Sequence, residues 1–310
     1  MDILLVDDSR GDAGLVREAL RDERPQCTLH VVTDGVEAVD FLHRRKSYAA
    51  APRPDLIRLD LNMPRKDGRE VLAEVKTDKE LKAIPVVVLT TSDADQDVST
   101  CYSLHCNCYI TKPVVLDDFV NTVGTINRFW RTVAELPTRK AQSEVGISWS
   151  AVAGGSDGPS AARQPTPRRP MEILVAEDNP DHAVLIRRVI KQADPRHNVT
   201  LVAEGAEAMA YLLRQGDYAD APCPDLVLLN LRLPHADGRE ILPWVKQDEQ
   251  LKRIPVVVMA DSDTDPDILR GYSLHANCYV MKPVDHEEFA SAVRAIERFW
   301  LSSVKLPRVA

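Results

Sequence analysis

Five polar side chains closely follow short apolar runs in the first half of this 310-residue chain: Asp7, Asp8, Asp60, Thr90 and Lys112. Three carboxylates that lie close together repel one another unless a cation separates them, and oxygen ligands suit Mg²⁺. With Mg²⁺ bound, a carboxylate can act as the nucleophile on phosphorus and form an aspartyl phosphate. The metal and the lysine neutralise charge on the phosphoryl oxygens, and the threonine can donate a hydrogen bond to one of them. These residue types therefore predict phosphoryl transfer to an aspartate.

The elements that must position these side chains are predicted from the hydrophobic pattern. Apolar runs predict strands over residues 3–6, 29–32, 56–59, 86–89 and 108–110. Helical periodicity predicts helices over residues 10–21, 35–44, 68–76, 95–105 and 116–130. Five βα units imply a parallel sheet that is covered on both faces. Ligands bind such sheets beyond the carboxyl ends of the strands, where the polar residues are found.

An internal repeat sets the domain organisation. Residues 1–137 (copy one) align without a gap on residues 171–307, and 61 of the 137 positions are identical. The period is the size of a domain, so the chain is a tandem duplication with domains at 1–137 and 171–310 (copy two). Residues 138–170 lack apolar periodicity, contain Gly, Ser and Pro clusters, and are predicted to be a flexible linker.

Composition limits the classes of function. Copy one carries 18 basic and 23 acidic residues and copy two 16 and 22, so both are acidic, which argues against nonspecific binding to nucleic acid. The sequence contains neither a run of about 20 apolar residues, as a membrane helix needs, nor an N-terminal signal peptide. Its six cysteines form no metal-binding or disulfide framework. We therefore expect a cytoplasmic protein without membrane attachment.

The motifs then point to a family. Residues 6–8, 59–64, 89–90 and 111–113 resemble the receiver domain of bacterial two-component response regulators. More narrowly, residues 46–54, 81–92 and 126–137 resemble the phytochrome-associated single-domain response regulators. The resemblance implies two flavodoxin-like (βα)5 domains, each with a parallel sheet in the order 2-1-3-4-5.

The resemblance also implies roles for single residues of copy one. Asp60 would be the phosphoacceptor. Asp8, Asp60 and the carbonyl of Asn62 would hold Mg²⁺, with Asp7 acting partly through water. Lys112 would pair with the phosphate.

The same resemblance implies a conformational switch and a phosphoryl donor. Thr90 would move onto the phosphate and Tyr109 would turn inward. The donor would be a sensor histidine kinase of the phytochrome type. The protein would catalyse only its own phosphorylation and dephosphorylation, so it would not be an enzyme acting on a separate substrate.

Copy two departs from this pattern. Glu177, Asp178 and Lys282 keep the charge of their counterparts, but three positions change chemistry: Asn230, Arg232 and Ala260 replace Asp60, Asn62 and Thr90. An amide is a poor nucleophile, so no aspartyl phosphate can form at residue 230. Copy two therefore resembles a degenerate receiver, or pseudo-receiver, whose charged residues could survive as a structural ion pair.

Two questions stay open at this level. The phosphorylated protein would signal through protein contacts or onward phosphotransfer, since no DNA-binding domain is recognisable. The alternative function is that of a phosphorylation-independent scaffold, which would act through copy two. The repeated apolar stripe of the last helix, which ends in Trp130 and Trp300, predicts pairing through the fourth and fifth helices and the fifth strand. That pairing could join the two copies of one chain or join two chains as a homodimer.

Overall fold

The computed structural model describes residues 1–21, 27–137, 169–261 and 264–308. Copy one contains a five-stranded parallel sheet in the order β2-β1-β3-β4-β5. Its strands are β1 (Asp2–Val6), β2 (Thr28–Val32), β3 (Leu56–Leu59), β4 (Val86–Thr90) and β5 (Cys108–Thr111). Every residue of β3 and β4 is buried because helices cover both faces of the sheet. The predicted fold class and strand order are confirmed.

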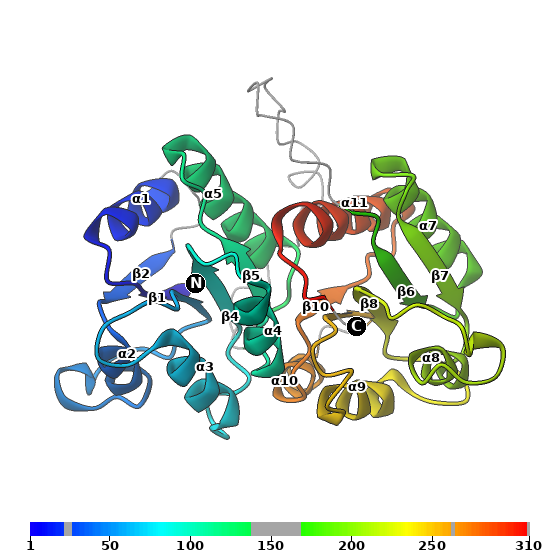
Figure 1. Cartoon of the computed structure of the whole chain (residues 1–310), viewed down its shortest axis with the longest axis horizontal. Helices are drawn as coiled ribbons and strands as arrows, with labels where there is room; N and C mark the ends of the chain where they lie inside the picture. The colour runs from blue at the N-terminus through cyan, green and yellow to red at the C-terminus, as the bar shows by residue number, and fades with distance from the viewer. Residues whose placement is uncertain (22–26, 138–168, 262–263, 309–310) are drawn as a thin grey trace.

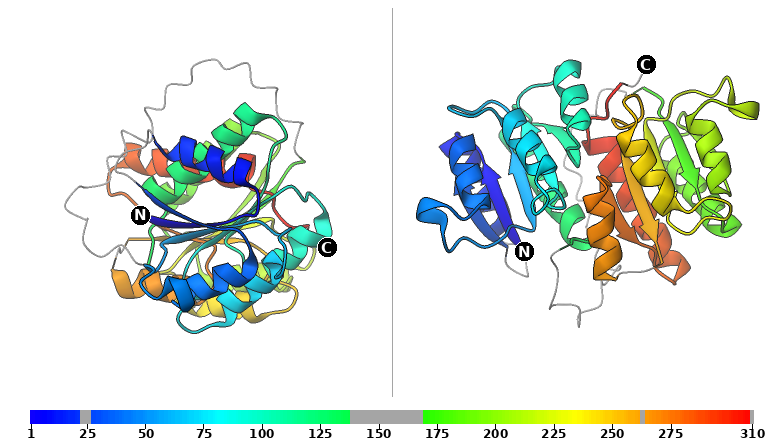
Figure 2. Two further views of the ribbon diagram at one scale, coloured as in Figure 1. Left: turned by 90° about the vertical axis from the view of Figure 1, so that its left-hand side faces the viewer. Right: turned by 90° about the horizontal axis from the view of Figure 1, so that it is seen from below.

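The helices of copy one form two layers, as the views in Figure 2 show. They are α1 (Arg10–Arg21), α2 (Gly35–Leu42), α3 (Gly68–Thr77), α4 (Asp95–Ser103) and α5 (Leu116–Thr132). In Figure 1, α1 and α5 lie on one side of the sheet and α2, α3 and α4 on the other. The polar residue before a helix fixes where it begins: Asp67 forms a capping box with Glu70 at the start of α3.

Copy two repeats this arrangement in the strand order β10-β9-β8-β6-β7. Its strands are β6 (Glu172–Ala176), β7 (Asn198–Val202), β8 (Leu226–Asn230), β9 (Val256–Ala260) and β10 (Cys278–Met281). Its helices are α7 (Pro180–Ala193), α8 (Gly205–Leu212), α9 (Gly238–Gln247), α10 (Asp265–Ser273) and α11 (His286–Glu297). A π-helical turn, η3 (Arg298–Ser303), follows α11. Of the predicted linker, residues 138–168 lie outside the described residues.

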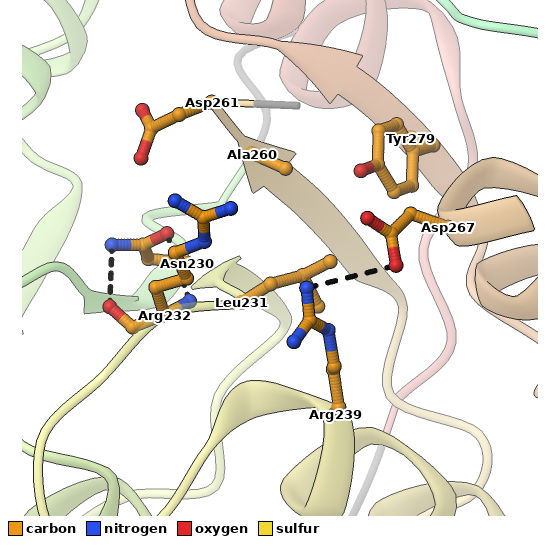
Figure 3. A pocket seen from close by; sticks show the side chains of 8 residues that line it. All are labelled: Asn230, Leu231, Arg232, Arg239, Ala260, Asp261, Asp267 and Tyr279. Atoms are coloured by element: carbon orange, nitrogen blue, oxygen red, sulfur yellow. Dashed lines mark hydrogen bonds and ion pairs between the residues drawn. The ribbon is translucent and has the colours of Figure 1, made fainter. Parts of the chain in front are cut away.

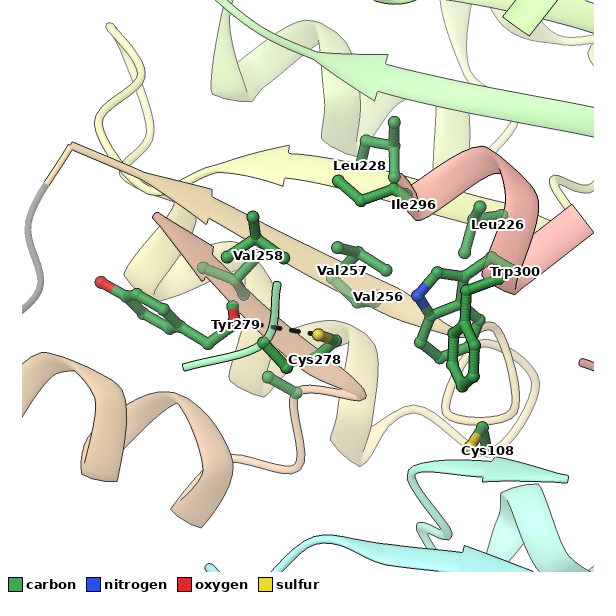
Figure 4. Packing of buried hydrophobic residues seen from close by; sticks show 14 of the residues in the cluster. Cys108, Leu226, Leu228, Val256, Val257, Val258, Cys278, Tyr279, Ile296 and Trp300 are labelled. Atoms are coloured by element: carbon green, nitrogen blue, oxygen red, sulfur yellow. Dashed lines mark hydrogen bonds between the residues drawn. The ribbon is translucent and has the colours of Figure 1, made fainter. Parts of the chain in front are cut away.

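The hydrophobic core crosses from one copy to the other. A single cluster of buried side chains joins the α1–α5 side of copy one to copy two, and Figure 4 shows Cys108 of copy one beside Trp300 and the strands of copy two. Phe129 and Phe299 stack with ring centroids 4.0 Å apart, which brings the two copies together along their last helices. Trp130 and Trp300, which end the two predicted apolar stripes, are fully buried, and this cluster encloses both of them.

Candidate functional site

The carboxyl end of the sheet in copy one gathers the predicted site residues. Asp7 follows β1, Asp60 follows β3, Thr90 is the last residue of β4, and Lys112 follows β5. All four are buried: the exposed fraction is 2% for Asp7, 6% for Asp60, 0% for Thr90 and 7% for Lys112. Parallel strands end at one edge of the sheet, so residues more than 100 positions apart in the sequence meet there.

Lys112 is the centre of this site. Its Nζ donates hydrogen bonds to Asp7 at 2.8 Å and to Asp60 at 2.7 Å. A third bond reaches Asp12 at 2.8 Å, a contact that the sequence did not predict. Asp12 lies in the first turn of α1, where an acidic residue is common for its interaction with the helix dipole, so nothing in the sequence distinguished it as a site residue.

Electrostatics favours the charged form of Lys112. Burial alone would lower the pKa of Lys112, but the carboxylates of Asp7, Asp12 and Asp60 raise it above its ordinary value. Burial also raises the pKa of Asp7, and the ammonium of Lys112 opposes this rise. A buried carboxylate cluster with one lysine retains excess negative charge, and a further cation would neutralise it.

The geometry of the acidic residues suits a divalent cation. Carboxylate oxygens of Asp7, Asp8 and Asp60 lie within 4.8 Å of one another, and Asp8 is exposed at the entrance. The backbone N–H of Asn62 donates to Asp60 at 3.2 Å and orients that carboxylate. A Cβ at Gly68 would lie 2.1 Å from the carbonyl oxygen of Asp60, so the start of α3 packs this closely only with glycine. Hard cations such as Mg²⁺ prefer oxygen ligands of this kind.

The predicted switch residues lie next to this cluster. Thr90 is fully buried, and its Oγ1 accepts a long hydrogen bond, 3.5 Å, from the backbone N–H of Ser92. Tyr109 is also fully buried, and its hydroxyl donates to the carbonyl oxygen of Ser92 at 2.8 Å. The ring of Tyr109 is therefore turned inward, and it links β5 to the loop between β4 and α4.

The corresponding site in copy two is satisfied by its own side chains. Lys282 donates to both oxygens of Glu177, at 3.3 and 3.1 Å. The Nδ2 of Asn230 lies 2.7 Å from Asp178, 3.4 Å from Glu177 and 3.0 Å from the carbonyl oxygen of Arg232. These acceptors match the positions of the ligands expected to hold a metal in copy one. The amide N–H groups of Asn230 thus point where a cation would be expected.

A small pocket lies beside this site, and Ala260, at the position of Thr90, is one of the residues that line it (Figure 3). It is lined by Asn230, Leu231, Arg232, Arg239, Ala260, Asp261, Asp267 and Tyr279. An ion pair between Arg239 and Asp267, 3.6 Å apart, closes one side. Asp261 lies 3.3 Å from the ammonium of Lys282, in the place that Thr91 occupies in copy one. Lys282 is therefore already held by carboxylates of its own copy.

Comparisons with known proteins agree with this geometry. The profile of the response regulator receiver domain matches residues 3–124 and 173–294. Response regulator Rcp1 of Synechocystis sp. is 50% identical over 135 residues, which are 44% of this chain and 92% of that protein. Response regulator PleD of Caulobacter vibrioides is 26% identical over 297 residues, 94% of this chain but 58% of its own length.

Solved structures show the same similarity. The Mn²⁺-bound form of Rcp1 is 50% identical over 42% of this chain and 93% of its own, with a TM-score of 0.41. The phosphorylated cyanobacterial phytochrome response regulator RcpA is 49% identical over 44% of this chain and 98% of its own, with a TM-score of 0.44. Among the described residues, no helix combines the length and apolar character needed to cross a bilayer. With both of its repeats matched, the chain belongs to the response regulator receiver-domain family, as two receiver domains in tandem that resemble phytochrome-associated regulators.

Proposed function

We propose that copy one accepts a phosphoryl group on Asp60 from a sensor histidine kinase. The observation that carries this proposal is the contact of Lys112 with Asp60 and Asp7 at a buried edge of the sheet. An oxygen of Asp60 attacks phosphorus, a P–O bond forms, the P–N bond to the donor histidine breaks, and the released imidazole takes up a proton. Water later hydrolyses the acyl phosphate, so the domain is a phosphoacceptor and not an enzyme on a separate substrate.

The surrounding residues have supporting roles in this proposal. Asp7, Asp8, Asp60 and the carbonyl of Asn62 would hold Mg²⁺, which when bound supplies positive charge to the phosphoryl oxygens. The ammonium of Lys112 neutralises charge on a further phosphoryl oxygen. Thr90 moves onto the phosphoryl group, and the inward ring of Tyr109 retains the altered loop.

Copy two acts as a pseudo-receiver that needs neither metal nor phosphate. Its amide at residue 230 donates to Asp178 and to the carbonyl of Arg232, which supports a site held in one state. Signalling then depends on copy one, and output passes through protein contacts or onward phosphotransfer. The similarity to RcpA favours a phytochrome as the kinase, and the six free cysteines favour the reducing cytoplasm.

The test is to treat the full chain with phosphoramidate and Mg²⁺ and to measure the intact mass. We expect one phosphoryl group per chain, labile to hydroxylamine as an acyl phosphate is. Asp60→Asn should abolish it, while Asp178→Asn, which removes a carboxylate from copy two, should leave it unchanged. Persistent label in Asp60→Asn would refute the assignment.

The alternative function, a phosphorylation-independent scaffold, predicts a different response. Beryllofluoride with Mg²⁺ imitates the phosphoryl group at a receiver site. Under our proposal its addition changes the environment of Tyr109 in copy one. A chain that binds its partners equally well with and without beryllofluoride would favour the scaffold.

A further inference from the structure

The two copies meet through contacts that repeat on both sides of a pseudo-two-fold axis. Nδ2 of Asn107 donates to the carbonyl oxygens of Ala276 and Asn277, at 3.2 and 3.1 Å. Nδ2 of Asn277 donates in return to the carbonyl oxygens of Cys106 and Asn107, at 3.0 and 3.1 Å. Two identical copies could form the same contacts. This part of the interface therefore contributes affinity without favouring one pairing over another.

The buried lysines extend the symmetric part. Lys76 donates to Oδ1 of Asn107 at 2.9 Å, and Lys246 donates to Oδ1 of Asn277 at 2.7 Å. The imidazoles of His105 and His275 stack with centroids 4.0 Å apart. Each of these residues has the identical residue 170 positions away. Selectivity between partners has to come from interface positions where the copies differ.

The first such position is in the segment that follows the last helix of each copy. The backbone N–H of Lys305 donates to the carbonyl oxygen of Tyr109 at 2.8 Å, and the backbone N–H of Glu135 donates to the carbonyl oxygen of Tyr279 at 2.8 Å. The main chains are equivalent, but the side chains carry opposite charges. Lys305 donates to the carbonyl oxygen of Asp93 and lies 3.6 Å from the carboxylate of Asp95.

This charge difference disfavours a pair of two first copies. In that pair Glu135 would take the place of Lys305, and its carboxylate would face the Asp93 carbonyl and the Asp95 carboxylate. Like charges juxtaposed across an interface oppose association. Arg308, which lies 3.6 Å from Asp95, adds to the attraction that only the second copy offers.

A second position disfavours a pair of two second copies. Lys305 does not exclude that pair, because positions 263 and 265, which correspond to Asp93 and Asp95, are also acidic in the sequence. Arg253 does exclude a pair of two second copies. Its guanidinium donates to Oγ of Ser99 at 3.2 Å. On the other side of the axis the equivalent positions hold Ala83, in place of Arg253, and Leu269, in place of Ser99. Two second copies would place the half-buried Arg253 opposite Leu269 on both sides, where its guanidinium loses its acceptor while Nε stays buried without one.

We infer that this interface selects copy two as the partner of copy one and rejects both pairings of like copies. Residues 135, 305, 253 and 99 determine the choice, and the symmetric asparagines, histidines and phenylalanines supply the common affinity. Tethering on one chain adds an effective concentration on the order of millimolar, so the preferred partner is the second copy of the same chain.

The test uses the full chain with a protease site placed within residues 138–168 and an affinity tag at the N-terminus. The folded chain is cut, diluted and analysed by native mass spectrometry. We expect a one-to-one complex of the two fragments, and capture of the tagged fragment should retain the other. Fragments that separate as monomers, or that re-sort into pairs of like copies, would overturn the inference.

Charge variants test the selecting residues directly. Lys305→Glu should weaken the association of the cut fragments roughly tenfold, because attraction is exchanged for repulsion. Adding Asp95→Lys should recover only part of this loss, because the reversed pair attracts again while Arg308 loses its acidic partner. Glu135→Lys should allow pairs of first copies, which the wild type does not form. Arg188→Glu makes the same charge change on an exposed turn of α7 and should have no effect. Equal effects of Lys305→Glu and Arg188→Glu would refute the role of Lys305.

Discussion

Asn230→Asp offers a sharp test of how copy two dispenses with a metal. The substitution is nearly isosteric and restores the carboxylate found in copy one. It removes the amide N–H groups that now point at Asp178, Glu177 and the carbonyl of Arg232. In the presence of EDTA, copy two should therefore become less stable, although its sequence moves toward that of a working receiver.

The size of the effect follows from the contacts. Losing donors to charged acceptors costs about 1.5–3 kcal/mol. A new charge about 4 Å from another at an effective dielectric constant of 20 would cost about 4 kcal/mol, but the introduced carboxyl can bind a proton and limit this cost. We expect a net loss of about 3 kcal/mol in the free energy of unfolding of copy two, or roughly 100-fold in its opening equilibrium.

The pH dependence has a defined sign. Burial already raises the pKa of Glu177, and like charges should raise the pKa of the introduced carboxyl above its unfolded value of about 3.9. The folded state then binds more protons than the unfolded state above this pH, so stability falls as pH rises. The charge-dependent part of the loss should be absent near pH 4 and complete once the pH exceeds the raised pKa.

Native-state hydrogen exchange with mass spectrometry measures this loss in the full chain. Amides of β6 and β8 should exchange roughly 100-fold faster at pH 7 in EDTA, while those of β1 and β3 stay unchanged and serve as an internal control. Mg²⁺ should restore little protection, because Arg232 places a positive charge at the site; adding Arg232→Asn should improve the response. Exchange of β8 within about threefold of wild type would refute the reasoning, since the amide would then not replace a cation.

Three further predictions concern copy one and the interface. Lys112→Met should lower the stability of copy one by about 3–5 kcal/mol in urea unfolding without Mg²⁺, since it leaves buried carboxylates unpaired; a smaller loss with Mg²⁺ present would show that the metal compensates. Burial and nearby lysines lower the pKa of His105 to about 4 and of His275 to about 3. Protonation therefore opposes the folded pair as pH falls below the unfolded value of about 6.5, so the cut fragments should dissociate more readily at pH 5 than at pH 7. Replacing both histidines by phenylalanine should flatten this difference. Gly68→Ala should destabilise copy one by about 3 kcal/mol and reduce its phosphorylation, while Gly238→Ala should destabilise copy two and leave phosphorylation intact.

Much of the fold could be predicted because the parallel strands are apolar throughout. The predicted strand at 86–89 and the observed β4 (Val86–Thr90) differ by one residue, and the helix predicted at 10–21 matches α1. Local patterns report burial, so they locate elements and the residues that follow them. They do not report which side chains of different elements touch.

The features that were missed all depend on such long-range contacts. Asp12 is one acidic residue among several at helix starts, and its contact with Lys112 spans 100 positions. The hydrogen bonds of Asn230 reach three acceptors, Glu177, Asp178 and the carbonyl oxygen of Arg232. No local pattern in the sequence indicates that these three acceptors lie around one amide. Trp130 lies at the end of a stripe that could equally face a partner or the core, and periodicity does not distinguish the two.

The docking of Lys305 along β5 has a consequence for how a signal leaves this protein. The covered face contains Tyr109 and the loop between β4 and α4, which are the parts of copy one that respond to Asp60 in our proposal. A downstream protein that reads this face must compete with a domain on the same chain. If the copies are apart in about one molecule in a hundred, its apparent affinity is about 100-fold weaker than its intrinsic affinity. The contacts between the copies then set the apparent affinity of the downstream protein. Substitutions at these contacts, far from both the phosphoacceptor and the target, can raise or lower that affinity.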